Sequence, residues 1–210
     1  MQTQSLQKQI SVPFFVLLLI VLSAQFTGCA SDSYTAKGAG QGATAGAVSG
    51  AVGGIVSALV FGGDPAEAAA RGAVWGGAAG ATAGAMAGSQ VDRQVNEQQQ
   101  SQLQALRQRI GDETFKGLEA LADCNHEASL QQAKKAQSSS NPNYALAALW
   151  LEVLTHADMR DEAKARSMYP ELVEKDWNIK TEAEAESKMR SALNALMDIR
   201  EEYKMPRVCS

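Results

Sequence analysis

The sequence predicts an all-α protein, in which an antiparallel transmembrane helical hairpin is followed by a helical domain. Three observations support this fold class. Glycine recurs at every fourth position in two segments, each segment has a long stretch without charge, and the rest of the chain shows helical periodicity without strand-like alternation. Because more than half of residues 36–91 are glycine or alanine, we expect no single hydrophobic core to run through the whole chain.

Residues 1–28 have the layout of an export signal. A polar start containing Lys8 precedes a largely apolar run from Ile10 to Phe26, which is short for a spanning helix of about 20 residues. We therefore expect this segment to be removed from the mature protein. An uncleaved signal anchor is the alternative.

The segment Phe26-Thr27-Gly28-Cys29 resembles the lipobox of bacterial lipoproteins, although leucine is more usual at the position of Phe26. The resemblance implies that Cys29 becomes the new N-terminus and carries acyl chains. Each buried methylene contributes about 0.8 kcal/mol, so several chains hold a protein firmly to a bilayer. Ala30 after the cysteine implies, by the same resemblance, transfer to the outer membrane. A buried structural cysteine is the alternative.

Two glycine repeats follow the cysteine. Four residues turn an α-helix by about 400°, so each repeat stays on one face of its helix. Two such faces let helix backbones touch, and within a bilayer the helix is the only local way to pair every backbone group. A disordered Gly/Ala spacer is the alternative. The repeats consist of Gly38, Gly42, Gly46, Gly50 and Gly54, and then Gly72, Gly76, Gly80, Gly84 and Gly88.

The charge pattern gives the two spans and the turn between them. No charged residue lies between Lys37 and Asp64 or between Arg71 and Asp92, and each stretch is long enough to cross about 30 Å of hydrocarbon. Asp64 can cap the second helix, with Pro65 at its first position and Glu67 completing a capping box. The two helices should therefore be antiparallel, which leaves the lipid anchor and the rest of the chain on the same side.

Residues 29–92 thus resemble the glycine-zipper domains of bacterial outer-membrane lipoproteins. The resemblance implies an envelope component and no shared chemistry. A second stripe of small residues offers a surface along which neighbouring copies can pack, so we expect homo-oligomers. That stripe consists of Ala39, Ala43, Ala47 and Ala51, with Ala69, Ala73, Gly77, Ala81 and Ala85 on the second helix.

We expect residues 93–111 to form a glutamine-rich helical stalk, with a disordered linker as the alternative, and residues 112–210 to form an all-α domain. Gly111 should end the stalk, and Asp112 should cap the next helix. The last helix opens with the capping box Thr181 to Glu184. The apolar positions of the domain fall into five helical groups: Phe115, Leu118, Leu121 and Ala122; Leu130, Ala133 and Ala136; Leu146, Leu149, Trp150, Val153 and Leu154; Ala163, Met168, Tyr169 and Leu172; Ala185, Met189, Ala192, Leu196, Ile199 and Tyr203.

Part of this domain resembles a tetratricopeptide repeat. The likeness covers residues 130–147, where Asn141-Pro142 stands at a helix junction, and the following turn at residues 158–163. Ser167 and Pro170 depart from the repeat pattern. The resemblance implies a surface of helical hairpins for interaction, while a plain helical bundle is the alternative.

The two cysteines of this half, Cys124 and Cys209, should form a disulfide in an exported protein. Closing this loop stabilises the domain by about 4 kcal/mol on the chain-entropy model. A metal site made by Cys124, His126 and Glu127 is the competing reading, but it lacks the second ligand pair of a closed site.

No motif for catalysis is present. The histidines, His126 and His156, should lie at the surface or at helix ends, and Trp150 and Trp177 should be core or groove residues. With 19 Lys and Arg against 23 Asp and Glu, the chain does not have the charge of a nucleic-acid binder.

These features together favour a non-enzymatic outer-membrane lipoprotein without metal or cofactor. On this hypothesis, membrane lipid holds the protein, its C-terminal domain lies in the periplasm, and we expect that domain to bind a protein partner or to stabilise the envelope. The alternative is an oligomeric membrane pore or a secretion-associated component built from the hairpins.

Overall fold

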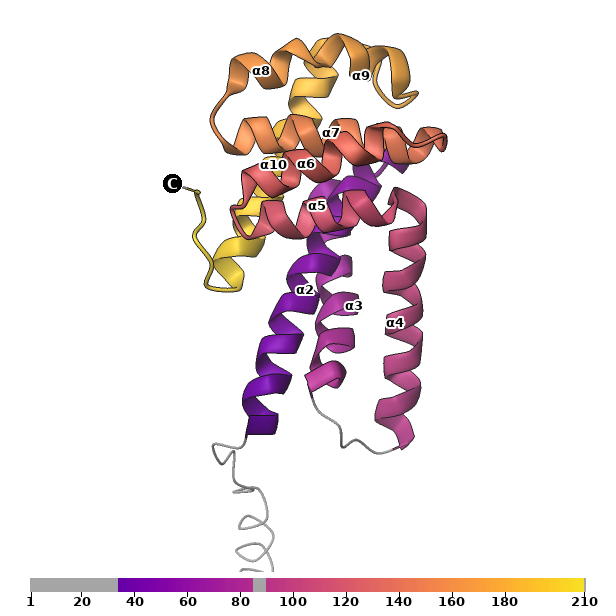
Figure 1. Ribbon diagram of the computed structural model, residues 1–210, viewed down its shortest axis with the longest axis vertical. Helices are drawn as coiled ribbons and strands as arrows, with labels where there is room; N and C mark the ends of the chain where they lie inside the picture. Colours follow the sequence, from indigo (N-terminus) through magenta and orange to yellow (C-terminus); the bar gives the residue numbers. More distant parts are fainter. Residues whose placement is uncertain (1–33, 85–89, 210) are drawn as a thin grey trace, which may run out of the picture.

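The computed structural model describes residues 34–84 and 90–209, and within these ranges the secondary structure is entirely α-helical (Figure 1). The predicted all-α class is therefore confirmed. The helices are α2 (Tyr34–Phe61), α3 (Pro65–Gly84), α4 (Gln90–Ile110), α5 (Asp112–Ala122), α6 (His126–Gln137), α7 (Pro142–Asp158), α8 (Glu162–Ser167), α9 (Tyr169–Lys175) and α10 (Glu182–Glu202).

The two glycine-rich helices, α2 and α3, form the predicted hairpin. Gly62 and Gly63 adopt φ angles of 84° and 138°, which glycine tolerates best, and so reverse the chain. The Asp64 carboxylate then accepts a hydrogen bond of 2.9 Å from the Glu67 amide, which confirms the cap. The Glu67 side chain accepts from Arg71 at 3.0 Å.

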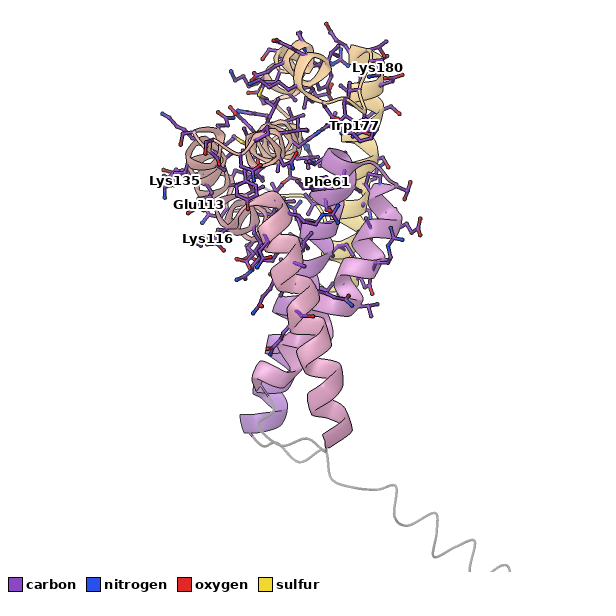
Figure 2. The ribbon with its side chains drawn as sticks, turned by 90° about the vertical axis from the view of Figure 1, so that its right-hand side faces the viewer. Phe61, Glu113, Lys116, Lys135, Trp177 and Lys180 are labelled. Carbon is purple, nitrogen blue, oxygen red and sulfur yellow. A yellow bond between two sulfur atoms is a disulfide. The ribbon has the colours of Figure 1, made fainter. Side chains whose placement is uncertain are left out.

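The other helices surround one end of this hairpin. Figure 1 shows α5, α6 and α7 stacked across that end, with α8 and α9 beyond them and the other end of the hairpin projecting beside α4. Helix α10 contacts both hairpin helices as well as α7 and α9, and α4 contacts both hairpin helices as well. Figures 1 and 2 place α4 and α10 on different sides of the hairpin.

Part of the hairpin and the helical domain share one hydrophobic core, although the composition of residues 36–91 predicted that no single core would run through the whole chain. The expectation averaged over the whole glycine-rich block and overlooked that its larger side chains concentrate near the end of α2. Ile55 and Leu59 are 1% and 0% exposed, in the same cluster as Phe115 of α5 and Leu196 of α10. The members from the hairpin are Ala47, Val48, Ala51, Val52, Ile55, Val56, Leu59, Val60, Ala69 and Ala73.

Two findings bear on the predictions for the hairpin. First, no helix in the described ranges combines the length and apolar character of a membrane-spanning segment. Second, Ala47, Ala51, Ala69 and Ala73 belong to the second small-residue stripe, and all four are buried within the chain. In this conformation they cannot form the predicted contact between neighbouring copies. The stripe was inferred for an isolated hairpin, and the helices that cover it were not foreseen.

The helices of the C-terminal half follow the apolar groups with one break. The group from Ala163 to Leu172 predicts one helix, but the structure divides it into α8 and α9 at Met168. Pro170 explains the division, because proline cannot supply the amide that a continuous helix requires. Ala163 is exposed, and Ala165 takes the buried position in α8.

The helix caps differ in detail from the prediction. Gly111, at φ 88°, precedes α5 without a side-chain cap, and Asp112 instead pairs with Lys116 at 2.6 Å. At α10 the Thr181 hydroxyl accepts from the Glu184 amide at 3.2 Å, as predicted. The Glu184 carboxylate accepts from the Lys180 amide, one residue before the position that a capping box would use.

Candidate functional site

The face between α2 and α3 is made of glycine and alanine backbone, and we call it the zipper face: Gly46, Gly50, Gly54, Ala68, Gly72 and Gly76. A Cβ atom on Gly50 would overlap the Gly72 carbonyl and would lie 3.0 Å from the Cα of Gly76. The overlap is reciprocal, because a Cβ on Gly72 would strike the Gly50 carbonyl. These positions therefore admit only hydrogen while the helices keep their present separation.

The zipper face includes part of the predicted glycine set. Gly46, Gly50, Gly54, Gly72 and Gly76 lie at the α2–α3 interface. Gly38, Gly42, Gly80 and Gly84 are positions of the same two helices. Gly88 and Cys29 lie outside the described residues, so the predictions for them stay predictions.

Gly53 belongs to a different face of α2, which the four-residue spacing does not reveal. A Cβ atom at Gly53 would lie 2.6 Å from Leu106 of α4 and 3.2 Å from Phe115 of α5. Gly53 thus lets α4 and α5 approach the hairpin. The signal in the sequence is the pair Gly53-Gly54, in which only the second glycine keeps the repeat.

Polar contacts also fasten the hairpin to the helical domain. The side-chain amide of Asn178 donates to the backbone carbonyl of Val60 at 3.1 Å, at the turn end of α2. The Ser49 hydroxyl donates to Glu119 of α5 at 2.9 Å, about three helical turns earlier. Because the two bonds lie at separate levels of α2, they fix both its position and its rotation against the domain.

The second notable site is a buried polar cluster at the carboxyl ends of α5, α7 and α10, which we call the Arg200 cluster: Arg200, Asp158, His126 and the Cys124–Cys209 disulfide. The Arg200 side chain is 0% exposed and donates to both oxygens of Asp158, at 2.7 and 2.8 Å. It also donates to the carbonyls of Leu121 and Ala122. A single guanidinium thereby satisfies the last turn of α5 and the carboxylate at the end of α7.

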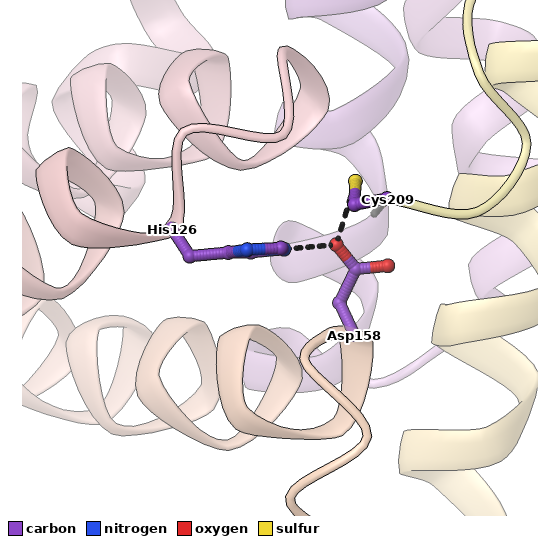
Figure 3. Close-up of side chains that lie close together, drawn as sticks. All are labelled: His126, Asp158 and Cys209. Atoms are coloured by element: carbon purple, nitrogen blue, oxygen red, sulfur yellow. Dashed lines mark hydrogen bonds and ion pairs between the residues drawn. The ribbon is translucent and has the colours of Figure 1, made fainter.

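The cysteine pair and one histidine complete this cluster, and Figure 3 shows how His126 and Cys209 lie against Asp158. Cys124 follows α5 and forms a disulfide with Cys209. This is the pair that the sequence predicts. The Nε2 atom of His126 lies 2.7 Å from an Asp158 oxygen, and the Cys209 sulfur lies 3.3 Å from the same oxygen. His126 stands at the predicted helix end, but its side chain is only 18% exposed.

The electrostatics of Asp158 reflect two opposed effects. Burial by itself would raise the pKa of this carboxyl, but hydrogen bonds from Arg200 and His126 hold the pKa below its ordinary value. Asp158 is therefore ionised in the folded protein and compensates the buried guanidinium. Sequence reasoning did not find this pair. Its signal is that Arg200 stands four residues after Leu196, on the apolar face of the last helix.

The two tryptophans and the second histidine singled out in the sequence lie in different environments. Trp150 is buried, and its indole nitrogen donates to Asp176 at 2.8 Å, so it is a core residue as predicted. Trp177 is 69% exposed, and its assignment to the core or a groove is wrong. His156 lies near the end of α7 with its side chain 13% exposed, and its nearest acidic partner is Asp161 at 3.8 Å.

The metal site that the sequence offered as the alternative to the disulfide does not form from the residues named for it. Glu127 is exposed, and the donor atoms that gather with His126 come from Asp158 and Cys209, all within 4.8 Å of one another. Of the three residues in the sequence-based metal site, only His126 belongs to this group, and the fold brings Asp158 and Cys209 to it from distant parts of the chain.

Comparison with known proteins agrees with this description of the hairpin. Residues 8–92 match the family model of the YMGG-like Gly-zipper, which confirms the glycine-zipper segment and is consistent with a membrane-associated envelope protein. No curated protein and no solved structure matches the chain. The tetratricopeptide likeness stays a prediction.

Proposed function

We propose that this protein is a non-enzymatic outer-membrane lipoprotein, anchored through Cys29 and its glycine-zipper segment, whose helical domain lies in the periplasm. The match of residues 8–92 to a glycine-zipper family is the observation that carries the proposal. The close approach of α2 and α3 through the zipper face supports it, because small residues at the contact are typical of helices that associate within a bilayer. The acyl chains would provide the lasting attachment to lipid.

The helical domain would act as a rigid body at one end of the hairpin and bind a protein partner or stabilise the envelope. The shared core and the two polar contacts on α2 support this part, since they couple movement of the hairpin to the domain. Trp177 is the natural place to look for a partner. A large indole with 69% exposure, next to the contact between Asn178 and the hairpin, is a typical interface anchor.

Lipid attachment is tested by feeding labelled palmitate to cells that make the full chain. We expect label in the wild-type protein and in a Cys124→Ser control, and none in Cys29→Ser. The wild-type protein should fractionate with the outer membrane and leave it only with detergent. An unlabelled protein in the soluble periplasmic fraction would refute the anchoring proposal.

The partner is tested with a photo-crosslinking amino acid at position 177 in intact cells. A matched probe at Lys180, also exposed and three residues away, controls for general surface capture. We expect a discrete product at 177 that is weaker or absent at 180. Equal capture at both positions, or capture of copies of this chain alone, would contradict the partner-binding role.

An oligomeric pore remains the alternative function, and purified protein in planar bilayers distinguishes it through discrete conductance. The buried positions Ala47, Ala51, Ala69 and Ala73 argue against assembly along the second stripe. Homo-oligomers would therefore need another surface. Chemical crosslinking of the purified protein in detergent measures whether they form.

A further inference from the structure

The Arg200 cluster gathers donors that suit a transition metal. One cysteine sulfur, an imidazole nitrogen and a carboxylate oxygen come together from three places in the sequence (Figure 3), and the sulfur is bonded to that of Cys124. His126 Nε2, the Asp158 oxygen and Cys209 Sγ lie within 4.8 Å of one another. Cys124 Sγ is not part of this group of three, but it is bonded directly to Cys209 Sγ and would be the fourth donor.

Two separations in the cluster lie within about 1 Å of those in a tetrahedral zinc site. Zinc–nitrogen and zinc–oxygen bonds near 2.1 Å, and zinc–sulfur bonds near 2.3 Å, separate neighbouring ligand atoms by about 3.3–3.8 Å. His126 Nε2 and Asp158 lie 2.7 Å apart, and Cys209 Sγ and Asp158 lie 3.3 Å apart. To admit the ion, His126 Nε2 and the Asp158 oxygen must move apart by about 0.7 Å, and the two sulfurs must separate once their bond is reduced. Cys209 can make this movement, because it lies beyond the end of α10.

The surroundings of the cluster also suit a divalent ion. Asp158 is already compensated by Arg200, so the pair adds no net charge to the site. Two thiolates would then balance the two charges of Zn²⁺, and the imidazole would bind in its neutral form. A charge-balanced set is the arrangement that a buried site tolerates.

The scaffold of the cluster does not depend on the disulfide. Arg200 holds Asp158 and the carbonyls of Leu121 and Ala122 with its own hydrogen bonds. It thereby keeps the ends of α5, α7 and α10 together when the sulfurs are separated. Cys124, His126 and Asp158, which stand at or close to these helix ends, would therefore remain near one another in the reduced protein, and only Cys209 would be free to move.

We propose that the Cys124–Cys209 disulfide and a bound zinc ion are alternative states of one site, with Cys124, Cys209, His126 and Asp158 as the zinc ligands. A dithiol reductant passes two electrons to the disulfide and closes to its own disulfide, which leaves two protein thiols. Zn²⁺ then replaces the two thiol protons and forms two zinc–sulfur bonds. In the reverse step a disulfide oxidant accepts two electrons from the two thiolates and becomes a dithiol, the Cys124–Cys209 bond forms again, and the ion is released because it has lost both sulfur ligands.

The test uses the full chain in detergent, with Cys29→Ser so that only the two domain cysteines remain. The protein is reduced by an immobilised dithiol, which is filtered away, and Zn²⁺ is titrated without oxygen against a chromophoric chelator. We expect one ion per chain, bound at least about 100-fold more tightly by the reduced than by the oxidised protein. Co²⁺ should give the visible absorption of tetrahedral thiolate coordination only after reduction.

Two variants identify the ligands. His126→Gln should weaken zinc binding by at least about 10-fold, whereas His156→Gln, a histidine outside the cluster, should leave it unchanged. The Cys124→Ser/Cys209→Ser double variant should bind no better than the oxidised protein. Equal binding by oxidised and reduced chains, or by this double variant and the reduced chain, would overturn the proposal.

Circular dichroism keeps the test decisive when reduction loosens the fold. Helical signal that falls on reduction and returns with zinc supports the site, because the ion then replaces the disulfide as the constraint. A reduced chain that stays helical and binds no zinc overturns the proposal. Helical signal that is lost on reduction and is not restored by zinc overturns it as well.

Discussion

Replacing Arg200 by methionine should destabilise the folded protein by about 3–5 kcal/mol, the usual cost of leaving one partner of a buried ion pair uncompensated. The structure places this substitution at the upper end of such effects. Asp158, with its side chain 3% exposed, would lose its two guanidinium hydrogen bonds. The carbonyls of Leu121 and Ala122 would lose their bonds to Arg200 at the same time.

The same helix offers a matched control. Arg190 of α10 also pairs with a carboxylate, Glu186 at 2.6 Å, but its side chain is 61% exposed. Arg190→Met should therefore cost at most about 1 kcal/mol, as exposed pairs do. A double variant, Asp158→Leu with Arg200→Met, should recover much of the stability lost by the single change, because no charge is then left buried.

The pH dependence gives a second check on Arg200→Met. The lowered pKa of Asp158 stabilises the wild-type fold at pH values above the unfolded pKa, about 3.9, and this stabilisation is lost as the pH falls through the folded pKa. Without Arg200, burial dominates and raises the pKa of this carboxyl, so the variant gains relative stability as the pH falls. The difference in unfolding free energy between the wild type and Arg200→Met should therefore become smaller as the pH is lowered from 7 to 4.

Urea unfolding in detergent measures these quantities, with tryptophan fluorescence and circular dichroism as probes. Trp150 is a suitable reporter, because it is buried and its indole nitrogen is hydrogen-bonded to Asp176. An Arg200→Met variant within about 1 kcal/mol of Arg190→Met would refute the reasoning. A pH-independent difference between the variant and the wild type would also refute it.

Three further predictions concern the hairpin. Gly50→Ala should destabilise the fold by about 1–2 kcal/mol in urea unfolding despite the better helix propensity of alanine, because the new Cβ would meet the backbone of α3. Gly53→Ala should destabilise it less, because its Cβ would meet the movable end of the Leu106 side chain. Equal destabilisation by the two substitutions would contradict this prediction. Asp64→Ala should cost about 1 kcal/mol in the same assay through the lost cap, and no change would show that the cap contributes nothing. A chain that starts at residue 93 lacks the α2 part of the core and should bind a hydrophobic dye and unfold without a sharp thermal transition; cooperative unfolding near the wild-type temperature would refute this.

Local features of the fold could be predicted from the sequence. The hairpin turn, the cap by Asp64 and the helices of the C-terminal half follow from residue spacing and turn chemistry, which act over a few residues. The side-chain cap at Thr181 follows in the same way. The break between α8 and α9 could also have been found, because Pro170 was recognised as a departure from the repeat pattern.

Long-range features could not be predicted in this way. The side chains of Val52, Ile55 and Leu59 suit a lipid surface as well as a protein core, so periodicity alone does not tell which one covers them. The Arg200 cluster depends on helices that are brought together only by the fold. Its members are separated by up to 85 residues in the sequence, from Cys124 to Cys209, and spacing rules do not reach that far.

The burial of the hairpin end gives the zipper face a second role. Because Gly50 and Gly72 let the two backbones touch, the hairpin is thin where α4 and α10 contact it from different sides. A side chain on the zipper face would widen the hairpin and displace both of these helices, since packed interiors transmit small changes in volume. The zipper glycines therefore determine the dimensions of the core of the helical domain as well as the separation of α2 and α3. Substitutions among them should lower the stability of the whole fold cooperatively, rather than loosen the hairpin alone.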